Sequence, residues 1–530
     1  MKSNHLHKII LKTATVLLAV LLLFSTCLLS GCAEESFTLY FGIDKMPKNI
    51  DPQKASSYSE ILAVRNCFKG LFTLDENGNA KKALAEDYTI SDDGLVYTFK
   101  VKNDTIWSNN KPVTAYDFEF GIKRAALAET DSPHTELLEN IKGAKELISG
   151  NDAELYVYAN DSHTLTITLT KPDQNFLLKL TNTVFMPCNE EFFNKCSGKY
   201  GLSASNILTN GDYRIKSWVE GSFVRLMKNN LDGDYFEAES VYLSVSSKGK
   251  DTVTRINDKE IGMTVNYSDD YKTVNTEKYT VLSEYRNNYA IVINKSSAIG
   301  KNEKLTEALN LAIHREYYVS RLNERFTVAN SVIPKNAILF GKRFSNYGTA
   351  EEYSKNYSSV DARELFLAGV KELSGKKFPK TEIITFDNAE IKSILSDVIL
   401  KWQQDLGAYV NVKTVSSEEA LMSRVNAGDF TIAFVPLPSD VSEILGLFSE
   451  NHGVDIKSTE YNKLINEINS TDDIKVAAEN AVKATEILAN EPCVIPIFSK
   501  PTSIIYDKEY QNVNYHKADM TVEFASIYKK

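Results

Sequence analysis

The residue types that most often carry out chemistry are present in this sequence, but they lack the spacings that catalysis or metal binding requires. No Gly-x-Ser-x-Gly segment is present to place a nucleophilic serine, and no His-Glu-x-x-His segment is present to hold a catalytic zinc ion. No Cys-x-x-Cys pair is found either. The histidines beyond residue 100 lie far apart in the chain: His134, His163, His314, His452 and His516. We therefore expect no catalytic residues, no metal site and no cofactor.

The elements that would hold a binding site are predicted to be strands in much of the first half of the chain. Residues 97–101 and 164–170 alternate apolar and polar side chains, which is typical of half-buried strands. Residues 37–41 are also predicted to form a strand. Asn77-Gly78 is a strong signal for a hairpin turn.

The second half of the chain is predicted to be more helical. Apolar residues recur every three or four positions from Ile391 to Leu406, which predicts one amphipathic helix, and Gly407 suits its C-terminal end. A strand at 410–415, a helix opened by Ser416 and a strand at 431–435 are predicted to follow. This alternation of helices and strands is typical of an α/β lobe.

The composition is that of a large globular protein. The chain has 530 residues, of which 43% are apolar and 25% are charged. At roughly 150 residues per domain, this length predicts about three to four domains. The formal charge of −10 gives no electrostatic support for a nucleic-acid partner.

The N-terminus has the features of a secretory signal peptide. A basic start leads into an apolar run from Val16 to Leu29, and no acidic residue occurs before Glu34. The run ends in Leu29-Ser30-Gly31-Cys32, which resembles the bacterial lipobox. We therefore predict a signal peptide at 1–31, lipidation of Cys32 and a short tether at 32–36, with the protein anchored to the cell membrane on its extracytoplasmic side. The alternative is a retained N-terminal anchor helix.

Four cysteines remain beyond the predicted tether: Cys67, Cys188, Cys196 and Cys493. They are too few to stabilise a chain of this size through disulfides, so the fold must depend on its hydrophobic cores. A bridge between Cys188 and Cys196 is one possibility, and unpaired thiols are the favoured one.

Several short motifs occur in one order along the chain. They are Ile50-Asp51-Pro52-Gln53-Lys54, Phe68-Lys69-Gly70-Leu71-Phe72, Asp92-Asp93-Gly94, Trp107-Ser108, Lys111-Pro112-Val113-Thr114-Ala115, Thr209-Asn210-Gly211-Asp212-Tyr213, Arg424-Val425-Asn426-Ala427-Gly428-Asp429-Phe430 and Pro492-Cys493-Val494-Ile495-Pro496. Together they resemble the oligopeptide- and dipeptide-binding lipoproteins of ABC importers, which are extracellular solute-binding proteins of family 5. The similarity extends over about residues 37–530.

The resemblance implies an α/β fold of two hinged lobes, of the type II periplasmic-binding-protein kind, with an additional subdomain in the first lobe. It places lobe I at 37–74, 185–285 and 501–530, the additional subdomain at 75–184, and lobe II at 286–500. The lobes are therefore expected to be built from segments that are far apart in sequence.

The resemblance also implies a set of ligand-binding residues between the lobes. Counting from Ala433 places the family's acidic anchor for a peptide amino group at Asp440. A carboxylate suits this role because it can form a charge-assisted hydrogen bond with the amino group. A solvated turn aspartate is the alternative for this residue. The other expected ligand-binding residues take their places from the motifs: Ser56, Ser57, Tyr58, His134, Arg424, Phe434 and Leu437.

The sequence departs from the family at several of these places. Phe434 stands where some members have a basic residue that can meet a peptide carboxylate, and Leu437 stands at the position of a cleft tryptophan. Thr306 and His314 replace an arginine and an aspartate of one family helix. A short peptide held at both ends is therefore less expected here.

The function implied by the resemblance is that of a lipid-anchored, monomeric receptor. It would capture peptides between the lobes and deliver them to the permease subunits of an ABC transporter. Three alternatives stay open: a receptor on the same fold for a nickel chelate, haem or other non-peptide ligand, a peptide-pheromone sensor, and an envelope hydrolase.

Overall fold

The computed structural model describes residues 36–75, 78–229, 238–246, 249–266, 274–322, 326–353, 356–450, 452–471, 473–517 and 519–530. The predicted signal peptide and most of the predicted tether, including Cys32, lie outside these residues. In the part of the chain that is described, no helix is both long enough and apolar enough to cross a membrane.

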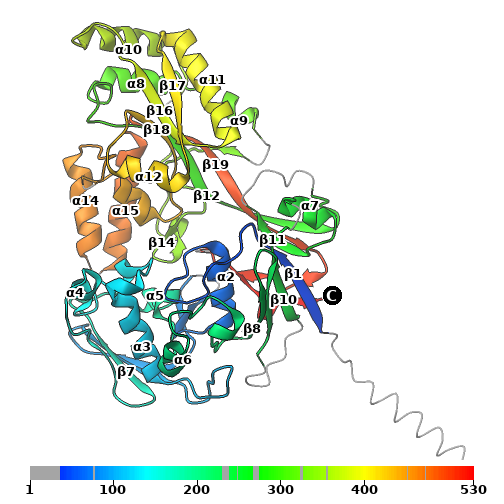
Figure 1. Cartoon of the computed structure of the whole chain (residues 1–530). Helices are drawn as coiled ribbons and strands as arrows, with labels where there is room; N and C mark the ends of the chain where they lie inside the picture. Colours follow the sequence, from blue (N-terminus) through cyan, green and yellow to red (C-terminus); the bar gives the residue numbers. More distant parts are fainter. Residues whose placement is uncertain are drawn as a thin grey trace, which may run out of the picture.

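One large mixed sheet extends through the whole molecule (Figure 1). Its strands lie in the order β17 (Val410–Val415), β16 (Thr381–Phe386), β18 (Ile432–Pro436), β12 (Tyr279–Ile293), β19 (Val494–Asp507), β11 (Met263–Asn266), β1 (Phe37–Gly42), β10 (Ala238–Ser244), β9 (Phe223–Lys228) and β8 (Tyr213–Val219), and β13 (Thr327–Val328) also pairs with β19. The two longest strands, β12 and β19, are antiparallel neighbours from Tyr279 opposite Asp507 to Val292 opposite Val494.

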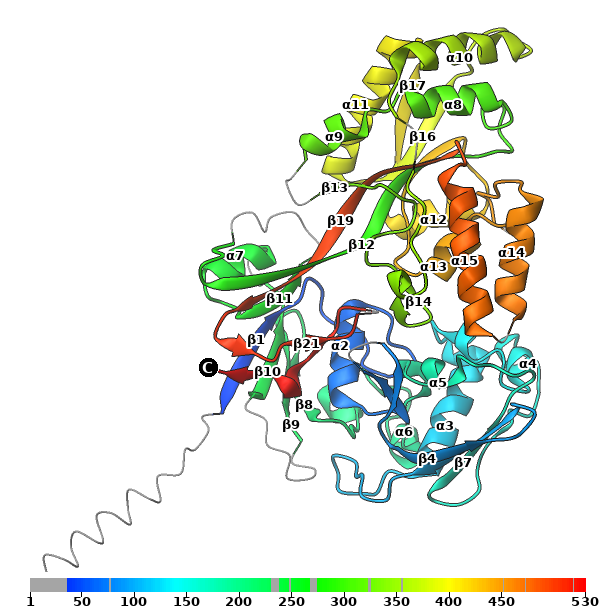
Figure 2. The same cartoon turned by 180° about the vertical axis from the view of Figure 1, so that it is seen from behind.

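The two largest hydrophobic cores of the described residues lie at the two ends of these long strands. One core contains residues between Leu39 and Val265 together with C-terminal residues between Ile504 and Ile527. The other contains residues between Ala290 and Phe498. The protein therefore has two lobes, which β12 and β19 join (Figures 1 and 2). The residue limits predicted for the lobes and for the subdomain stay a prediction.

Lobe II surrounds its part of the sheet with helices (Figure 2). Their bounds are α8 (Glu303–Leu311), α9 (Arg315–Ser320), α10 (Ser359–Glu372), α11 (Ala389–Leu406), α12 (Glu418–Asn426), α13 (Val441–Leu447), α14 (Thr459–Ser470) and α15 (Ile474–Ala489). A small hairpin of β14 (Ile338–Leu339) and β15 (Lys342–Arg343) lies on the side that faces lobe I (Figure 2).

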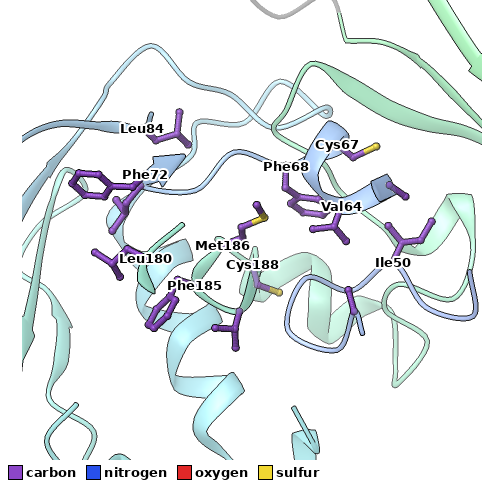
Figure 3. Packing of buried hydrophobic residues seen from close by; sticks show 14 of the residues in the cluster. Ile50, Val64, Cys67, Phe68, Phe72, Leu84, Leu180, Phe185, Met186 and Cys188 are labelled. Atoms are coloured by element: carbon purple, nitrogen blue, oxygen red, sulfur yellow. The ribbon is translucent and has the colours of Figure 1, made fainter. Parts of the chain in front are cut away.

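Lobe I carries a second sheet of four strands, β4 (Ala85–Ile90), β5 (Val96–Val101), β7 (Thr164–Thr168) and β6 (Val157–Ala159), and a hairpin of β2 (Phe72–Leu74) and β3 (Ala80–Lys82). The lobe's helices include α2 (Tyr58–Cys67), α3 (Ala115–Ala126), α4 (Ala144–Ile148), α5 (Phe176–Lys179), α6 (Glu190–Lys195) and α7 (Thr252–Asn257). Figure 3 shows how side chains near α2, such as Val64 and Phe68, pack in the same cluster as Phe72, Phe185 and Met186. The second sheet therefore shares its hydrophobic core with the rest of lobe I.

A buried ion pair fixes the segment that precedes α2. The guanidinium of Arg124 in α3 donates to both carboxylate oxygens of Asp51, at 2.7 and 2.6 Å, and also to the side-chain oxygen of Gln53. The side chains of Arg124 and Asp51 are only 7% and 2% exposed. Because removing one partner of such a pair leaves a buried charge, we expect a cost of about 3–5 kcal/mol. The Asp-Pro motif thus anchors the approach to α2 on α3.

Most local predictions from the sequence are confirmed. The predicted strands 37–41, 97–101 and 410–415 correspond to β1, β5 and β17. Gly407 ends α11 in the left-handed conformation, with φ of 78°. The helix predicted to open at Ser416 opens one residue later: its N-cap is Ser417, whose hydroxyl accepts from the N–H of Ala420 at 3.2 Å.

All four predicted body cysteines, Cys67, Cys188, Cys196 and Cys493, are buried free thiols. Burial raises the pKa of Cys188 to about 12, so this thiol stays protonated at neutral pH. The same physical cause raises the pKa of Cys67 and of Cys493. These cysteines act as small apolar side chains of the two cores.

Candidate ligand-binding site between the lobes

Asp440 lies in the loop that connects β18 to α13, on the side of lobe II that faces lobe I. Its carboxylate caps α13 by accepting from the N–H of Ser442 at 2.8 Å. Three contacts fix the loop: Leu437 N donates to Asn288 O at 2.7 Å, Ile338 N donates to Ser439 O at 2.9 Å, and Arg286 donates to Ser439 Oγ at 2.9 Å. The position of the Asp440 carboxylate is therefore set by both β12 and the β14–β15 hairpin.

Two side chains of lobe I interact electrostatically with the helix that follows this loop. Glu443, in the first turn of α13, interacts electrostatically with Asp440 and, across the lobe boundary, with Glu136 and His134. His134 Nδ1 lies 3.7 Å from Glu136 Oε1, and their side chains are 27% and 62% exposed. Water therefore still reaches this group of three carboxylates and one imidazole, which we call the Asp440 group.

Crowding of carboxylates changes their proton affinity. Burial raises the pKa of Asp440 above its ordinary value of 3.8, against the lowering effect of backbone hydrogen bonds and of Arg286. Burial, followed by the charges of Asp440 and Glu136, also raises the pKa of Glu443. At Glu136 burial acts in the raising direction, but the interaction with His134 lowers the pKa overall. A positively charged group placed here would relieve the repulsion among these carboxylates.

Ser56, Ser57 and Tyr58 lie at the start of α2 in lobe I. The carboxylate of Glu60 accepts from the N–H groups of Ser56 and Ser57, at 3.1 and 3.0 Å, and from those of Lys48 and Asn49. Although burial acts to raise it, these backbone hydrogen bonds lower the pKa of Glu60. Tyr58 Oη donates to Met520 O at 3.2 Å. Glu60 thus holds two loops of lobe I in place, and sequence reasoning did not identify it.

The remaining predicted site residues make their contacts with other parts of lobe II. Phe434 is 0% exposed and stacks on Tyr289, with ring centroids 5.9 Å apart. Leu437 is likewise 0% exposed and belongs to the core of lobe II. Arg424 donates to Asp429 Oδ2 at 2.9 Å and lines a surface recess with Lys380, Glu382 and Lys413. A role in ligand binding stays a prediction for all the residues proposed from the motifs.

A second interlobe group lies on the joining strand β12. Arg343, from the β14–β15 hairpin of lobe II, donates to both oxygens of Glu284 at 2.6 Å. Tyr515, in β21 (Asn514–Tyr515) of lobe I, donates to Glu284 Oε1, also at 2.6 Å. The side chains of Glu284 and Arg343 are 10% and 20% exposed. This Glu284 group ties the two lobes to one carboxylate, and no spacing in the sequence indicates it.

The tip of the same hairpin contacts lobe I at a pair of glycines. Gly341 and Gly78 have φ of 73° and 79°, and a Cβ placed on Gly78 would lie 2.0 Å from the carbonyl oxygen of Gly341. Gly78 belongs to the turn between β2 and β3, which are paired as the Asn77-Gly78 motif predicts; Asn77 itself lies outside the described residues. The close approach of these two turns therefore requires glycine at residue 78.

Comparison with known proteins identifies the relatives of this architecture. The family model of the bacterial extracellular solute-binding proteins, family 5, matches residues 79–450. A dipeptide-binding protein of Lactococcus lactis subsp. cremoris is 26% identical over 547 aligned positions, which cover 97% of this chain and 98% of the relative. The periplasmic oligopeptide-binding protein OppA of Salmonella typhimurium is also 26% identical, over 85% of each chain.

The fold has solved counterparts as well. The structure of Listeria monocytogenes OppA bound to peptide superposes with a TM-score of 0.70, covering 94% of this chain and 99% of that one at 24% identity. This likeness shows the shared two-lobed fold.

Proposed function

We propose, from the premise that this chain belongs to the family 5 of bacterial extracellular solute-binding proteins, that it captures peptides between its lobes and delivers them to an ABC transporter permease. In this proposal the protein is a monomer held on the extracytoplasmic side of the membrane by a lipid on Cys32. It binds and releases its ligand without breaking a bond, and ATP hydrolysis takes place in another subunit.

The observation that carries the proposal is the Asp440 group. Glu443 of lobe II interacts electrostatically with Asp440 and, across the lobe boundary, with Glu136 and His134, so a cation bound among these groups would interact with both lobes at once. The free amino group of a peptide is such a cation, and a charge-assisted hydrogen bond to a half-buried carboxylate is stronger than a neutral one. Contact with both lobes favours the closed arrangement over the open one.

The rest of a peptide would extend away from this group. Extended peptides bind well at such interfaces because their backbone amides pair with main-chain groups, while side chains project into hydrated space. The two relatives, a dipeptide-binding and an oligopeptide-binding protein, support a peptide ligand of either length.

Native mass spectrometry of freshly purified protein tests the ligand class. We expect a heterogeneous set of peptides to be released on denaturation and to be identified by sequencing. Release of one peptide of fixed sequence would favour a pheromone sensor, and release of a metal chelate or haem would overturn the peptide proposal.

The substitution Asp440→Asn tests the role of the Asp440 group. Asparagine is also a good helix N-cap, so D440N removes the charge while keeping the cap of α13. We expect affinity for a free-amino peptide to fall about tenfold to a hundredfold, from the loss of a charge-assisted bond of about 1.5–3 kcal/mol. Affinity for the N-acetylated peptide is expected to change much less.

The matched control is D387N, which neutralises an exposed aspartate of lobe II that pairs with Lys392. It should leave both affinities unchanged. Equal losses for the free and the acetylated peptide in D440N would remove Asp440 from the role of amino-group anchor.

A further inference from the structure

The outer face of the lobe I sheet carries a second surface, which lies outside the Asp440 group. Strands β1, β10, β9 and β8 lie side by side at the side of lobe I away from β7 (Figures 1 and 2). Alternate residues such as Leu39, Val241 and Leu226 are 0% exposed and pack in the core. The positions between them point outward, away from that core. We call this outward surface the aromatic face.

The aromatic face is built around one ladder of rings. Tyr40 stacks on Tyr242 with centroids 5.2 Å apart and planes 17° apart, and Tyr242 contacts Phe223 at 5.0 Å. The guanidinium of Arg225 lies 5.2 Å from the Tyr242 ring and donates to Ser240 Oγ at 2.9 Å. Tyr40 and Val219, at two places on this face, are 47% and 45% exposed. The rings are thus held in place and remain accessible to solvent.

The charge of this face is opposite to that of the whole protein. Without residues 1–31 the chain has 57 Lys and Arg residues and 70 Asp and Glu residues, a formal charge of −13. Glu239 is the only acidic residue of the four strands. In the alternation of β10 it belongs to the face opposite to that of the outward Ser240 and Tyr242. Arg225 and Arg214 share the aromatic face, where Arg225 pairs across the strands with Tyr242 and Arg214 with Met227. An anionic surface would therefore be attracted to this side and repelled by much of the rest.

The predicted tether leads directly to this face. β1 begins at Phe37, five residues after Cys32. Five residues of fully extended chain span at most about 17 Å. If Cys32 carries the lipid, as the proposed function has it, the first residue of β1 stays within that distance of the lipid headgroups. Tyr40 follows three residues later on the same strand.

We propose that the aromatic face is a membrane-contact surface, which lies against anionic phospholipid headgroups beside the lipid anchor. Tyrosine and other aromatic side chains favour the headgroup region, where a ring is partly buried and a hydroxyl stays wet. Arginine is attracted to anionic headgroups over a few ångströms, and the absence of outward carboxylates on these strands removes the opposing repulsion. The lipid then tethers the protein and the aromatic face orients it.

The test uses the lipidated full-length protein in vesicles that contain no other protein. An introduced V219C thiol on the aromatic face can be labelled selectively, because the four cysteines of the described residues are buried. The probe is a neutral polyethylene-glycol maleimide that does not cross membranes. Labelling is compared between vesicles of phosphatidylcholine alone and vesicles with one third phosphatidylglycerol. V360C, at a position 75% exposed on α10 of lobe II, is the control.

We expect the V219C thiol to be labelled at least fivefold more slowly on the anionic vesicles, and the V360C thiol equally fast on both. Addition of R214Q and R225Q to V219C should restore its labelling rate. Equal rates for V219C on both vesicles, or slowing that persists after both arginine substitutions, would overturn the proposal. Protein mass and peptide affinity are measured on the same samples, so failed lipidation or failed peptide binding is recognised separately.

Discussion

Glu284 allows a quantitative prediction about closure of the two lobes. Its carboxylate lies on β12 and accepts hydrogen bonds from Arg343 of lobe II and from Tyr515 of lobe I. When the lobes move apart, Glu284 can follow only one of them. If it follows lobe II the bond from Tyr515 breaks, and if it follows lobe I the ion pair with Arg343 breaks. Opening therefore always costs one interaction of this group.

The size of that cost follows from the geometry. A hydrogen bond to a charged group contributes about 1.5–3 kcal/mol, and the distances of 2.6 Å with a Glu284 side chain only 10% exposed place both bonds within that range. Burial also raises the pKa of Tyr515, so its hydroxyl remains a donor at neutral pH. Removal of the bond that breaks on opening should weaken peptide binding by about tenfold to a hundredfold, because binding requires the closed arrangement.

The assay is calorimetric titration of one peptide into the variants Y515F and R343Q. We expect one of the two variants to lose affinity by the amount given above, and the identity of that variant shows which lobe Glu284 follows. Y528F and R321Q remove a 44%-exposed tyrosine and an arginine whose side chain is 53% exposed, and they serve as controls. If Y515F and R343Q both bind within twofold of the unmodified protein, while remaining folded, the Glu284 group has no part in closure.

Three further predictions concern other parts of the molecule. First, the pKa of Asp440 is raised, so its carboxylate takes up a proton at a pH above 3.8. Affinity for a free-amino peptide should therefore fall on acidification, whereas affinity for the N-acetylated peptide should stay constant. Titrations between pH 7 and pH 4 check this. Second, burial and the nearby Arg65 lower the pKa of His516 from 6.5 to about 4, so the folded state binds its proton less readily than the unfolded state, even with Asp519 and Glu523 close by. His516 should therefore leave the free energy of unfolding unchanged above pH 6.5 and reduce it by about 3 kcal/mol as the pH falls to 4. Thermal melting should show this decrease in H452Q and should not show it in H516Q. Third, G78A should weaken peptide binding by separating the β2–β3 and β14–β15 turns. G221A, with a similar φ of 69° and no atom within 4 Å of the added Cβ, should show only the cost of the left-handed conformation, about 1–2 kcal/mol in the free energy of unfolding, which thermal unfolding measures.

The sequence predicts the local elements well because their causes are local. The helix from Ala389 to Leu406 follows from the spacing of its apolar residues, and its end at Gly407 follows from the freedom of glycine. The two-lobed fold follows from the resemblance to a known family that the ordered motifs carry, and the structure gives one of these motifs a physical role: its Asp51 pairs with Arg124 and holds the start of α2.

The interlobe groups could not be predicted in this way. Glu284 is separated from Arg343 by 59 residues and from Tyr515 by 231 residues. Arg343 and Tyr515 lie in strands of only two residues, which are too short to carry a pattern of their own. Nothing distinguishes Glu284 from a surface glutamate until β12 is placed between the lobes. Motif positions likewise cannot tell whether a side chain faces the ligand or the core: Phe434 and Leu437, taken from the motifs as ligand-binding residues, are both 0% exposed.

The β14–β15 hairpin connects the candidate anchor with the closure group. Ile338 at its start pairs with Asp440 as a parallel bridge, and Arg343 at its end holds Glu284. Just before the hairpin, Asn336 exchanges two hydrogen bonds with the backbone of Tyr285, at 2.7 and 2.8 Å. A shift of the Asp440 loop on ligand binding must therefore either displace the hairpin or break its bridge. Because neighbouring residues that share a rigid element couple energetically, the losses caused by D440N and R343Q should not simply add, whereas those of D440N and the distant R321Q should.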